Sequence, residues 1–326
     1  MRAIQMSETG GPQVLRAVEA ARPVPGEGQV LIRVAAAGVN YTDVMARQGV
    51  YLTRESAPAL PAVPGSEVAG TVAAVGPGVA APAVGSRVAA LVHGGYAEYA
   101  VAPAELAFPL PVEVDFAEAV GYLVQGITAM QLLRDCARMR AGERVLVHSA
   151  AGGVGTLAVQ LAKELGASSV VATAGSRQKL ELAASLGADV CVDYTQADWS
   201  QEVLAATDGH GVDIVLDAVG GDVTEQSLAC LGSFGRLLVY GISNKRLATF
   251  AGTQLMARNQ TVSGYWLRSR MAEEKGTTDV VPELLELAAQ GKIKTVVQHV
   301  FPLDQAGKAH QAISDRQTVG KVVLLV

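Results

Sequence analysis

The stretch that decides the fold is Val145-Leu-Val-His-Ser-Ala-Ala-Gly-Gly-Val-Gly155, which runs directly into Thr156-Leu-Ala-Val-Gln-Leu-Ala-Lys163. It predicts an apolar strand, a glycine-rich turn with the pattern Ala150-x-Gly152-x-x-Gly155, and a helix. Such a turn lets the backbone approach a pyrophosphate without a Cβ in the way, and it directs the helix N–H groups toward the anion. The stretch therefore indicates a dinucleotide-binding βαβ unit. An ordinary strand-to-helix turn is the alternative.

The next apolar strand, Ser169–Thr173, ends about 20 residues beyond the last glycine of the turn. A dinucleotide-binding unit binds the adenosine ribose at this position. A chain that binds NAD would have Asp or Glu there, whereas this chain has Ser176, Arg177 and Lys179. A hydroxyl and two cations attract a 2′-phosphate that a carboxylate would repel. The sequence therefore predicts NADPH as the cofactor. N-capping with a solvated first turn is the alternative, although cations are unfavourable at a helix N-terminus.

Composition limits the class of protein. A chain of 326 residues exceeds one ordinary core, so two domains are expected. Half of the residues are hydrophobic and 17% are charged, which is typical of a compact α/β enzyme. The net charge of −5, without a Lys/Arg cluster, argues against nucleic acid as a partner.

Cysteine usage and hydropathy predict the compartment. The three cysteines include no C-x-x-C pair, so neither a disulfide framework nor a zinc module is expected. A reducing, cytoplasmic compartment fits best. No apolar run approaches the roughly 20 residues of a membrane span, so we expect a soluble protein without one.

The chain divides into two parts that differ in their expected pattern of secondary structure. Up to about residue 120, short Val- and Ala-rich segments alternate with turns, and strands are expected at Val30–Ala35, Glu67–Ala73 and Arg87–Val92, as in a half-open β-barrel. From about residue 125, strands alternate with helices and predict a parallel sheet covered on both faces. Its six strands are expected near 144–148, 169–174, 189–194, 212–217, 235–241 and 260–264.

The last part of the chain is expected to return to the first domain. It begins with an amphipathic helix at Val281–Gly291, continues with a segment from Val296 to Phe301, and ends in the strand Lys321–Val326.

Several strings resemble the medium-chain dehydrogenase/reductase superfamily, within it the zinc-free quinone oxidoreductases, and above all their vesicle-amine-transport-protein-like branch. Besides the glycine-rich turn, they are Gly38-Val-Asn-Tyr-Thr-Asp43, Arg47-Gln-Gly-Val-Tyr51, Pro64-Gly-Ser-Glu-Val-Ala-Gly70, Gly94-Gly-Tyr-Ala-Glu-Tyr99, Gln125-Gly-Ile-Thr-Ala129, Gly211-Val-Asp-Ile-Val-Leu-Asp-Ala-Val-Gly-Gly221 and Gly320-Lys-Val-Val-Leu-Leu325.

The resemblance implies an α/β protein of two domains. A GroES-like catalytic domain with a partly open β-barrel is expected over residues 1–122 and 267–326. A Rossmann domain with a doubly wound parallel six-stranded sheet is expected over residues 123–266, where it would bind NADPH. Relatives commonly form homodimers by pairing edge strands of the nucleotide sheet, and Gln260–Trp266 would be that edge.

The same comparison argues against a metal. Zinc enzymes of this superfamily have Cys in the segment matching Val39–Asp43 and Gly-His-Glu where this chain has Gly65-Ser-Glu67. Here Ser66 replaces the histidine, and no cysteine precedes Cys136. Without nitrogen and sulfur ligands no zinc site is expected. The substrate carbonyl must then be polarised by hydrogen bonds or be electrophilic enough to accept hydride without a Lewis acid.

The resemblance also implies a catalytic set. Asn40, Thr42 and Asp43 match the segment that faces the nicotinamide and the substrate, with a capped turn before a helix near 42–48 as the alternative. Tyr51 retains an aromatic residue of the family, whereas Met45 stands where many quinone reductases have one.

The implied cofactor-binding residues lie at strand ends, at helix starts and in the C-terminal return. Thr128 would supply a hydroxyl near the nicotinamide, and Tyr194 would lie on the adenosine phosphate side. His93 and His148 are interpreted as structural residues. The full cofactor set is Thr128, Ala151, Gly152, Gly153, Val154, Gly155, Ser176, Arg177, Lys179, Tyr194, Tyr240, Gly241, Ser243 and Arg316.

The function implied is NADPH-dependent transfer of hydride from nicotinamide C4 to a quinone or similar electrophilic carbonyl compound. An enoyl or 2-alkenal reductase is the alternative, because the turn from His148 to Gly155 also resembles the enoyl-reductase domains of polyketide synthases. That reaction needs a proton donor, for which Tyr41 and Tyr51 are candidates. A cofactor-binding scaffold without turnover is a third hypothesis.

Overall fold

The computed structural model describes residues 1–53 and 57–326, which divide into two compact units. Met1–Gln125 and Thr278–Val326 form the first unit, and Gly126–Thr277 form the second. The sequence assigns residues 123–125 to the second domain and residues 267–277 to the first, whereas the structure places each of these segments in the other unit. Two side-chain contacts account for the position of residues 267–277. Gln131 Nε2 donates to the Thr277 carbonyl at 2.8 Å, and an Arg270 guanidinium nitrogen donates to Cys136 Sγ at 3.1 Å.

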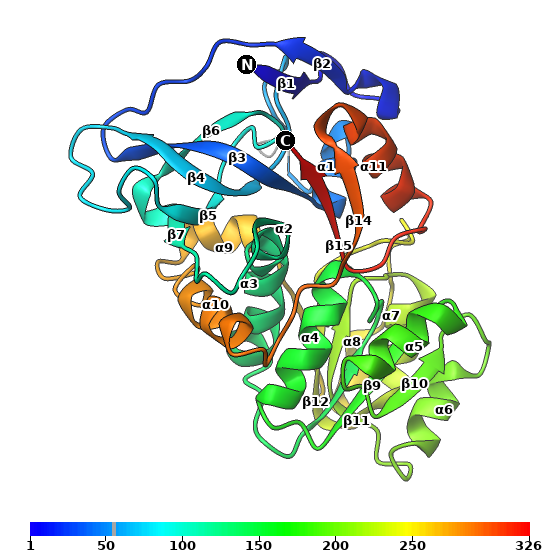
Figure 1. The fold of residues 1–326 in the computed structure, drawn as a ribbon. Helices are drawn as coiled ribbons and strands as arrows, with labels where there is room; N and C mark the ends of the chain where they lie inside the picture. Colours follow the sequence, from blue (N-terminus) through cyan, green and yellow to red (C-terminus); the bar gives the residue numbers. More distant parts are fainter. Residues whose placement is uncertain (54–56) are drawn as a thin grey trace. The chain divides into compact units, whose positions relative to one another are not determined.

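The second unit is built on a parallel six-stranded sheet (Figure 1). All six expected strands are present, and each neighbouring pair is parallel. The strand order, β10-β9-β8-β11-β12-β13, is that of the Rossmann fold. The strands are β8 (Arg144–Val147), β9 (Ser169–Ala174), β10 (Val190–Asp193), β11 (Val212–Asp217), β12 (Leu231–Val239) and β13 (Thr261–Gly264).

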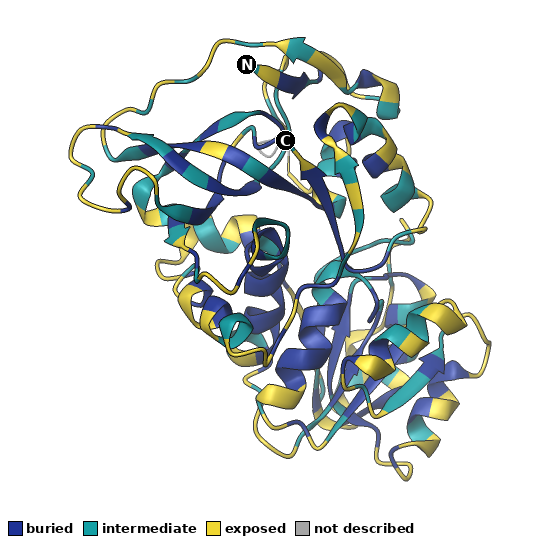
Figure 2. Ribbon diagram, in the orientation of Figure 1, coloured by how far each residue is buried: buried dark blue, intermediate teal, exposed yellow. Residues whose placement is uncertain are grey.

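Helices cover this sheet on both faces. The helices α4 (Gly153–Glu164) and α5 (Arg177–Ser185) pack on β8, β9 and β10, whereas α6 (Trp199–Ala205) and α7 (Asp222–Cys230) pack on each other. Because parallel crossovers are right-handed, the reversal of strand order between β10 and β11 puts the second pair on the opposite face. The central strands are accordingly buried along their length (Figure 2).

The second unit also contains helices other than the four that connect β8 to β12. They are α3 (Val124–Gln131), which begins just before the unit boundary, the π-helical segment Leu132–Cys136, α8 (Gly252–Met256) and α9 (Leu267–Glu273).

The first unit contains a seven-stranded sheet, ordered β14-β15-β3-β4-β5-β7 with β6 also paired to β3. The C-terminal strand β15 lies between β14 and β3, so the end of the chain does return to the first unit, as predicted. Besides the hairpin β1 (Arg2–Gln5) and β2 (Arg16–Glu19), its strands are β3 (Gln29–Val39), β4 (Glu67–Val75), β5 (Arg87–Leu91), β6 (Tyr99–Pro103), β7 (Ala107–Pro109), β14 (Val297–Pro302) and β15 (Lys321–Leu325).

Four α-helices complete the described part of this unit: α1 (Tyr41–Arg47), α2 (Phe116–Ala119), α10 (Val281–Ala289) and α11 (Ala306–Ser314). The alternating Val and Ala residues of the strands bury one side against a core that includes Ile32, Val72 and Tyr96. This sheet, antiparallel except for the parallel pair of β14 and β15, belongs to the GroES-like fold.

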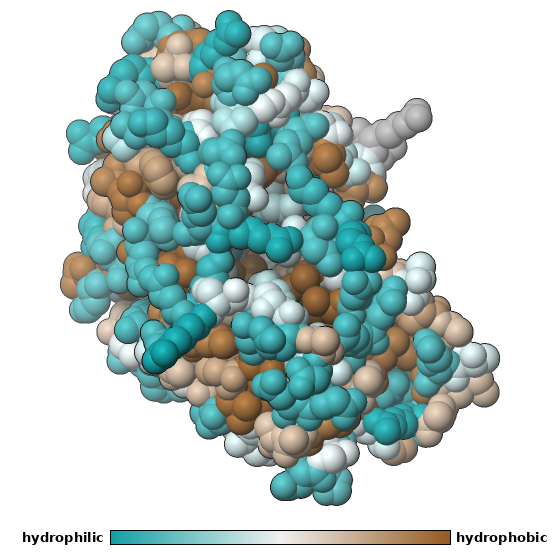
Figure 3. Space-filling model, turned by 90° about the vertical axis from the view of Figure 1, so that its right-hand side faces the viewer, coloured by the Kyte–Doolittle hydropathy of each residue, from teal (hydrophilic) through white to brown (hydrophobic). Residues whose placement is uncertain are grey.

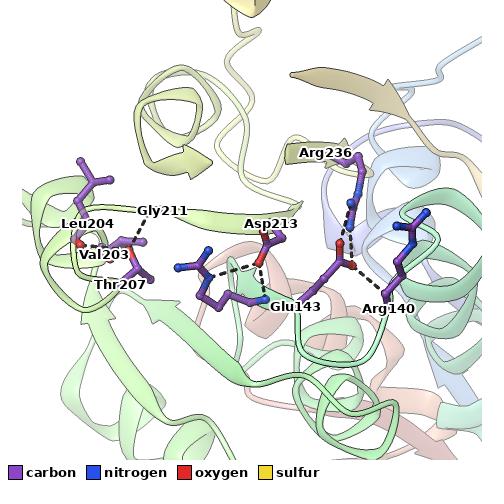
Figure 4. Close-up of polar contacts among 9 residues, drawn as sticks. Arg140, Glu143, Val203, Leu204, Thr207, Gly211, Asp213 and Arg236 are labelled. Atoms are coloured by element: carbon purple, nitrogen blue, oxygen red, sulfur yellow. Dashed lines mark hydrogen bonds and ion pairs between the residues drawn. The ribbon is translucent and has the colours of Figure 1, made fainter. Parts of the chain in front are cut away.

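Ion pairs hold the second sheet at the end where β8 begins (Figure 4). The Arg236 guanidinium donates two hydrogen bonds to the Glu143 carboxylate, at 2.9 and 2.7 Å. Nearby, the hydroxyl of buried Thr207 donates to the Val203 carbonyl at 2.9 Å and accepts from the Gly211 N–H at 3.1 Å. These contacts lie at the amino ends of the strands and serve the fold.

Polar and apolar side chains are interspersed on the face that Figure 3 shows. Across residues 1–53 and 57–326, no helix combines the length and the apolar character that crossing a membrane requires.

Candidate active site

The glycine-rich turn forms the start of α4. Gly152 is the N-cap, and the N–H groups of Gly153, Val154 and Gly155 begin the helix. The first N–H groups of a helix have no acceptor within it, so they are available to an anion. Ala151 is buried just before them.

Two further features fix the path of this turn. The Gly152 N–H donates to the Ser149 carbonyl at 2.8 Å, and the Ala150 N–H donates to the Thr173 carbonyl of β9 at 3.0 Å. A Cβ on Gly155 would overlap the Ser149 carbonyl oxygen and lie 2.7 Å from Ala150 Cα. Only glycine fits there, so α4 starts as close to β8 as the backbone allows.

The turn lies where the strand order reverses. The neighbouring strands β8 and β11 lead to opposite faces of the sheet, and in open α/β sheets ligands bind at the carboxyl ends of such a pair. Asp217 ends β11 fully buried, and it accepts hydrogen bonds from the Val219 N–H at 2.7 Å and from the Thr224 hydroxyl. It thereby shapes the loop after β11.

The segment after β12 reaches the same edge. The Tyr240 N–H donates to the Asp217 carbonyl and the Ser243 N–H to the Ala218 carbonyl, each at 2.9 Å. A Cβ on Gly241 would lie 3.0 Å from the Ala218 carbonyl oxygen. Burial, followed by the negative charge of Asp217, raises the pKa of Tyr240. The structure therefore places these residues against the loop after β11, at the same edge of the sheet as the turn before α4.

The predicted 2′-phosphate residues lie at the start of α5, after β9. Ser176 is the N-cap, and its Oγ accepts from the Lys179 N–H at 3.4 Å. Arg177 is 92% exposed and pairs with Glu181 at 2.8 Å. The capping alternative is therefore present in the structure. A side chain at Gly175 would come within 4 Å of the Tyr194 ring, so Tyr194 at the end of β10 adjoins this site.

Thr128 lies on α3 and contacts Tyr265, the residue that directly follows β13. Its hydroxyl donates to the Tyr265 hydroxyl, which in turn donates to Gln131 Oε1 at 2.8 Å. Burial raises the pKa of Tyr265. The Thr128 hydroxyl is thus engaged within the second unit.

In the first unit, the predicted catalytic residues form the start of α1. Asn40 is the N-cap, and its N–H donates to Asp43 Oδ2 at 2.8 Å, which closes a capping box. Burial raises the pKa of Asp43 to about 6, although the hydrogen bond from Asn40 acts in the opposite direction. Thr42 is exposed on the first turn.

The Asn40 side chain belongs to a fully buried polar cluster. Its Nδ2 donates to Glu67 Oε1 at 2.7 Å, and its Oδ1 accepts from Lys321 Nζ at 2.9 Å. Lys321 also pairs directly with Glu67, and both side chains are 0% exposed. Gln125 Nε2 donates to Asn40 Oδ1 at 3.3 Å. These contacts hold the Asn40 amide in one orientation.

A second buried chain leads from Asp43 to a histidine. The Tyr96 hydroxyl donates to Asp43 Oδ2 at 3.1 Å, so the Nε2–H of His310, 3.1 Å from that hydroxyl oxygen, is the donor to Tyr96. Burial, with the charge of Arg47, lowers the pKa of His310 to about 3. His310 is therefore a neutral hydrogen-bond donor.

Three other candidates of the first unit, Tyr41, Tyr51 and Arg316, are not part of the Asn40 cluster. The Tyr51 hydroxyl donates to the Ala46 carbonyl at 2.9 Å. Arg316 follows α11 and has a φ of 57°. Burial raises the pKa of Tyr41, and the positive charge of Arg316 acts in the opposite direction. The structure groups Arg316 with Tyr41 but places neither in the Asn40 cluster.

The two histidines that the sequence analysis interprets as structural differ in their exposure to solvent. His93 is exposed, whereas His148 is fully buried, as predicted. Among the residues that the structure describes, no three His, Cys, Asp or Glu side chains form a group suited to a metal ion.

Sequence reasoning missed the pairing of Glu67 with Lys321 and that of Tyr96 with His310. A signal exists for the first pair, because each charge begins a strand of otherwise apolar residues, and a buried charge requires a partner. The second pair leaves no signal in the pattern, because Tyr and His occur in core and surface alike.

Comparison with known proteins identifies the family. The family model described as alcohol dehydrogenase GroES-like domain matches residues 26–112, and the one described as zinc-binding dehydrogenase matches residues 153–299. A quinone oxidoreductase of Pseudomonas aeruginosa is 36% identical over 99% of this chain and 98% of its own length. The human synaptic vesicle membrane protein VAT-1 homolog is 36% identical over 95% of this chain and 82% of its own.

A solved structure agrees with these matches. The quinone oxidoreductase of Escherichia coli in complex with NADPH has a TM-score of 0.92 and 33% identity, and the match covers 100% of both chains. The present chain belongs to the quinone oxidoreductase family of the medium-chain dehydrogenase/reductase superfamily, a class of oxidoreductases.

Proposed function

We propose that this chain transfers hydride from NADPH to a quinone or a similar electrophilic carbonyl compound without a metal. The observation that carries the proposal is the turn before α4 at the reversal point of the sheet, beside a β9 end that carries Ser176, Arg177 and Lys179 and no carboxylate. The NADPH complex of the Escherichia coli relative supports the choice of cofactor.

The residues present fit a dinucleotide. A Cβ on Gly155 would overlap the backbone, so the turn is as tight as a closely approaching pyrophosphate requires, and the N–H groups of Gly153 to Gly155 would hold its charge. Bound NADPH supplies the hydride at nicotinamide C4. Ala151 and Gly152 shape the turn, and Tyr194 would border the adenosine end.

Further residues of the second unit would complete the cofactor site. Tyr240, Gly241 and Ser243 would line it at the end of β12, and Thr128 would act nearer the nicotinamide. Arg316, from the first unit, is proposed to contact the cofactor from the C-terminal return.

The residues around α1 would orient the substrate. The exposed Thr42 hydroxyl is available to donate to a substrate oxygen, and Asn40 and Asp43 fix the turn that carries it. Tyr51 lies beyond α1 and donates to the Ala46 carbonyl, so it would act as a proton donor only after giving up that bond.

The metal-free part of the proposal rests on the ligand types. Ser66 stands where zinc enzymes of the superfamily have a histidine, and a neutral hydroxyl is a poor ligand for Zn²⁺. An unactivated carbonyl would then lack several kcal/mol of charge stabilisation. Quinones need less of this charge stabilisation, because hydride addition to a quinone is intrinsically favourable.

Substrate preference tests the proposal. We expect para- and ortho-quinones to have a higher kcat/KM, with NADPH as donor, than saturated ketones by at least about a hundredfold, which is the rate equivalent of roughly 3 kcal/mol. The assay is NADPH oxidation across a panel of quinones, 2-alkenals and alkyl ketones. A simple ketone as the best substrate would refute the proposal, and a best 2-alkenal whose turnover is lost in Tyr51→Phe would establish the enone alternative.

Cofactor selectivity gives a second prediction. A hydrogen bond to a charged group contributes roughly 1.5–3 kcal/mol, and NADH lacks the 2′-phosphate that Lys179 would contact. Lys179→Ala should therefore raise the Kd for NADPH by about tenfold to a hundredfold and leave the Kd for NADH within about threefold. Calorimetric titration of both cofactors measures the difference. Equal losses would mean that Lys179 supports only the fold.

Assembly and location are part of the proposal. β13 is an edge strand of the second sheet and is mostly exposed, so we propose that two copies pair through it as a homodimer. Light scattering with a strand-breaking Val262→Pro variant would test the dimer. We also propose that the enzyme acts in the cytoplasm.

A further inference from the structure

His148 stands between the end of β8 and the turn before α4, and both of its ring nitrogens are engaged inside the second unit. The side chain is 0% exposed. Nδ1 lies 2.7 Å from Thr173 Oγ1, at the end of β9, and Nε2 lies 2.8 Å from Ser227 Oγ, on α7. One imidazole therefore joins three elements just below the proposed phosphate site.

The hydrogen-bond directions define the state of the ring. The Ser227 hydroxyl donates to the Val223 carbonyl at 2.6 Å, so its oxygen accepts from the His148 Nε2–H. Nδ1 is then unprotonated and accepts from the Thr173 hydroxyl. Burial lowers the pKa of His148, although the charge of Asp217 acts in the opposite direction. The ring is thus a neutral imidazole with one fixed tautomer.

Thr173 transmits this arrangement to the turn. Its carbonyl accepts from the Ala150 N–H at 3.0 Å, while its hydroxyl donates to His148. Thr173 also lies three residues before Ser176, where the 2′-phosphate would bind. A single residue of β9 is therefore held by the imidazole and in turn holds the backbone that leads into α4.

We propose that His148 is a positioning residue of the dinucleotide site, which fixes the turn from Ser149 to Gly152 through Thr173. The inference rests on the proposed function, because it assumes that this turn binds a dinucleotide. The imidazole is 0% exposed, so it would not touch the cofactor itself. Its contribution is to the shape that the free N–H groups of α4 present to the pyrophosphate.

The experiment is a double-mutant cycle with cofactor affinity as the readout. Thr173→Val removes the hydroxyl but keeps the side-chain shape and the carbonyl that binds Ala150. Because one neutral hydrogen bond is lost, its Kd for NADPH should rise about threefold to tenfold. His148→Leu should raise it by about tenfold or more, and the double variant should not exceed His148→Leu, since both changes break the same link.

Two features separate positioning from a merely structural role. The Kd for NADH should rise by the same factor as that for NADPH, because the pyrophosphate is common to both, and kcat at saturating NADPH should stay within about twofold. The matched control is Thr207→Val, which removes another buried threonine hydroxyl at the opposite ends of the strands (Figure 4). It should lower stability without changing either Kd.

The outcomes are distinguishable. An unchanged Kd in Thr173→Val, or additive effects in the cycle, would overturn the role of His148, while reduction of a quinone by wild-type protein with NADPH would still uphold the proposed function. Wild-type protein that bound neither NADPH nor NADH would overturn both. If His148→Leu fails to fold, Thr173→Val against Thr207→Val still decides the question.

Discussion

Replacing Lys321 with Met is expected to lower the free energy of unfolding by about 3–5 kcal/mol. Lys321 and Glu67 are both 0% exposed, and their contact is reinforced by Asn40, which bonds to each of them. Removing the ammonium leaves the Glu67 carboxylate buried without a counter-charge. Urea unfolding followed by circular dichroism measures the loss.

A second variant shows whether the unpaired charge causes this loss. In Lys321→Met combined with Glu67→Gln the charge is gone. The new amide oxygen can still accept from Asn40 Nδ2, although the hydrogen bond from the Val124 N–H to the second carboxylate oxygen is lost. We expect the double variant to recover at least about half of the lost free energy. If Lys321→Met alone stayed within about 1 kcal/mol of wild type, the buried pair would have no structural importance.

The largest expected effect on binding comes from Gly155→Ala. The added Cβ would overlap the Ser149 carbonyl oxygen and lie 2.7 Å from Ala150 Cα, and both are backbone atoms that cannot rotate away. The turn must therefore move away from α4. Because the contacts of the helix N–H groups with the pyrophosphate depend on the position of the turn, we expect the Kd for NADPH to rise by about a hundredfold, the size of the loss in rate that a misplacement of about 1 Å causes in catalysis.

The matched control is Gly264→Ala, in the same unit at the edge strand β13, where nothing lies within 4 Å of the new Cβ. Its Kd should stay within about twofold of wild type. Calorimetry with NADPH and NADH should show equal losses for Gly155→Ala, because the turn faces the shared pyrophosphate. Normal cofactor affinity in Gly155→Ala would contradict the assignment of the turn.

The sequence predicted the Rossmann sheet well because its strands are continuous apolar runs separated by helical periodicity. The clearest difference is β12, which begins at Leu231 rather than near 235. Gly232 and Gly235 indicate a turn, but Leu231 pairs with Val212, and an irregularity in the register follows. Phe234, with a φ of 60°, marks the place where the chain departs from a regular strand.

The site was predicted less completely, for a physical reason. The residues of the turn before α4 are close in sequence, so their pattern reveals their geometry. Glu67 and Lys321 are separated by 254 residues, and only the folded first unit brings them together. The Thr128 hydroxyl likewise turns out to be engaged by Tyr265, a contact between distant segments that local spacing does not reveal.

Single-turnover hydride transfer by metal-free protein tests the proposed function most directly. Protein dialysed against a chelator, and shown by elemental analysis to hold no zinc, is loaded with NADPH and mixed rapidly with 1,4-benzoquinone. We expect the fluorescence of bound NADPH to be lost at a rate well above that of the uncatalysed reaction. This rate should fall when C4 of the nicotinamide carries deuterium, and added Zn²⁺ should not change it. Tightly bound NADPH that is oxidised no faster than in buffer, or oxidation that appears only with added Zn²⁺, would contradict the proposed function.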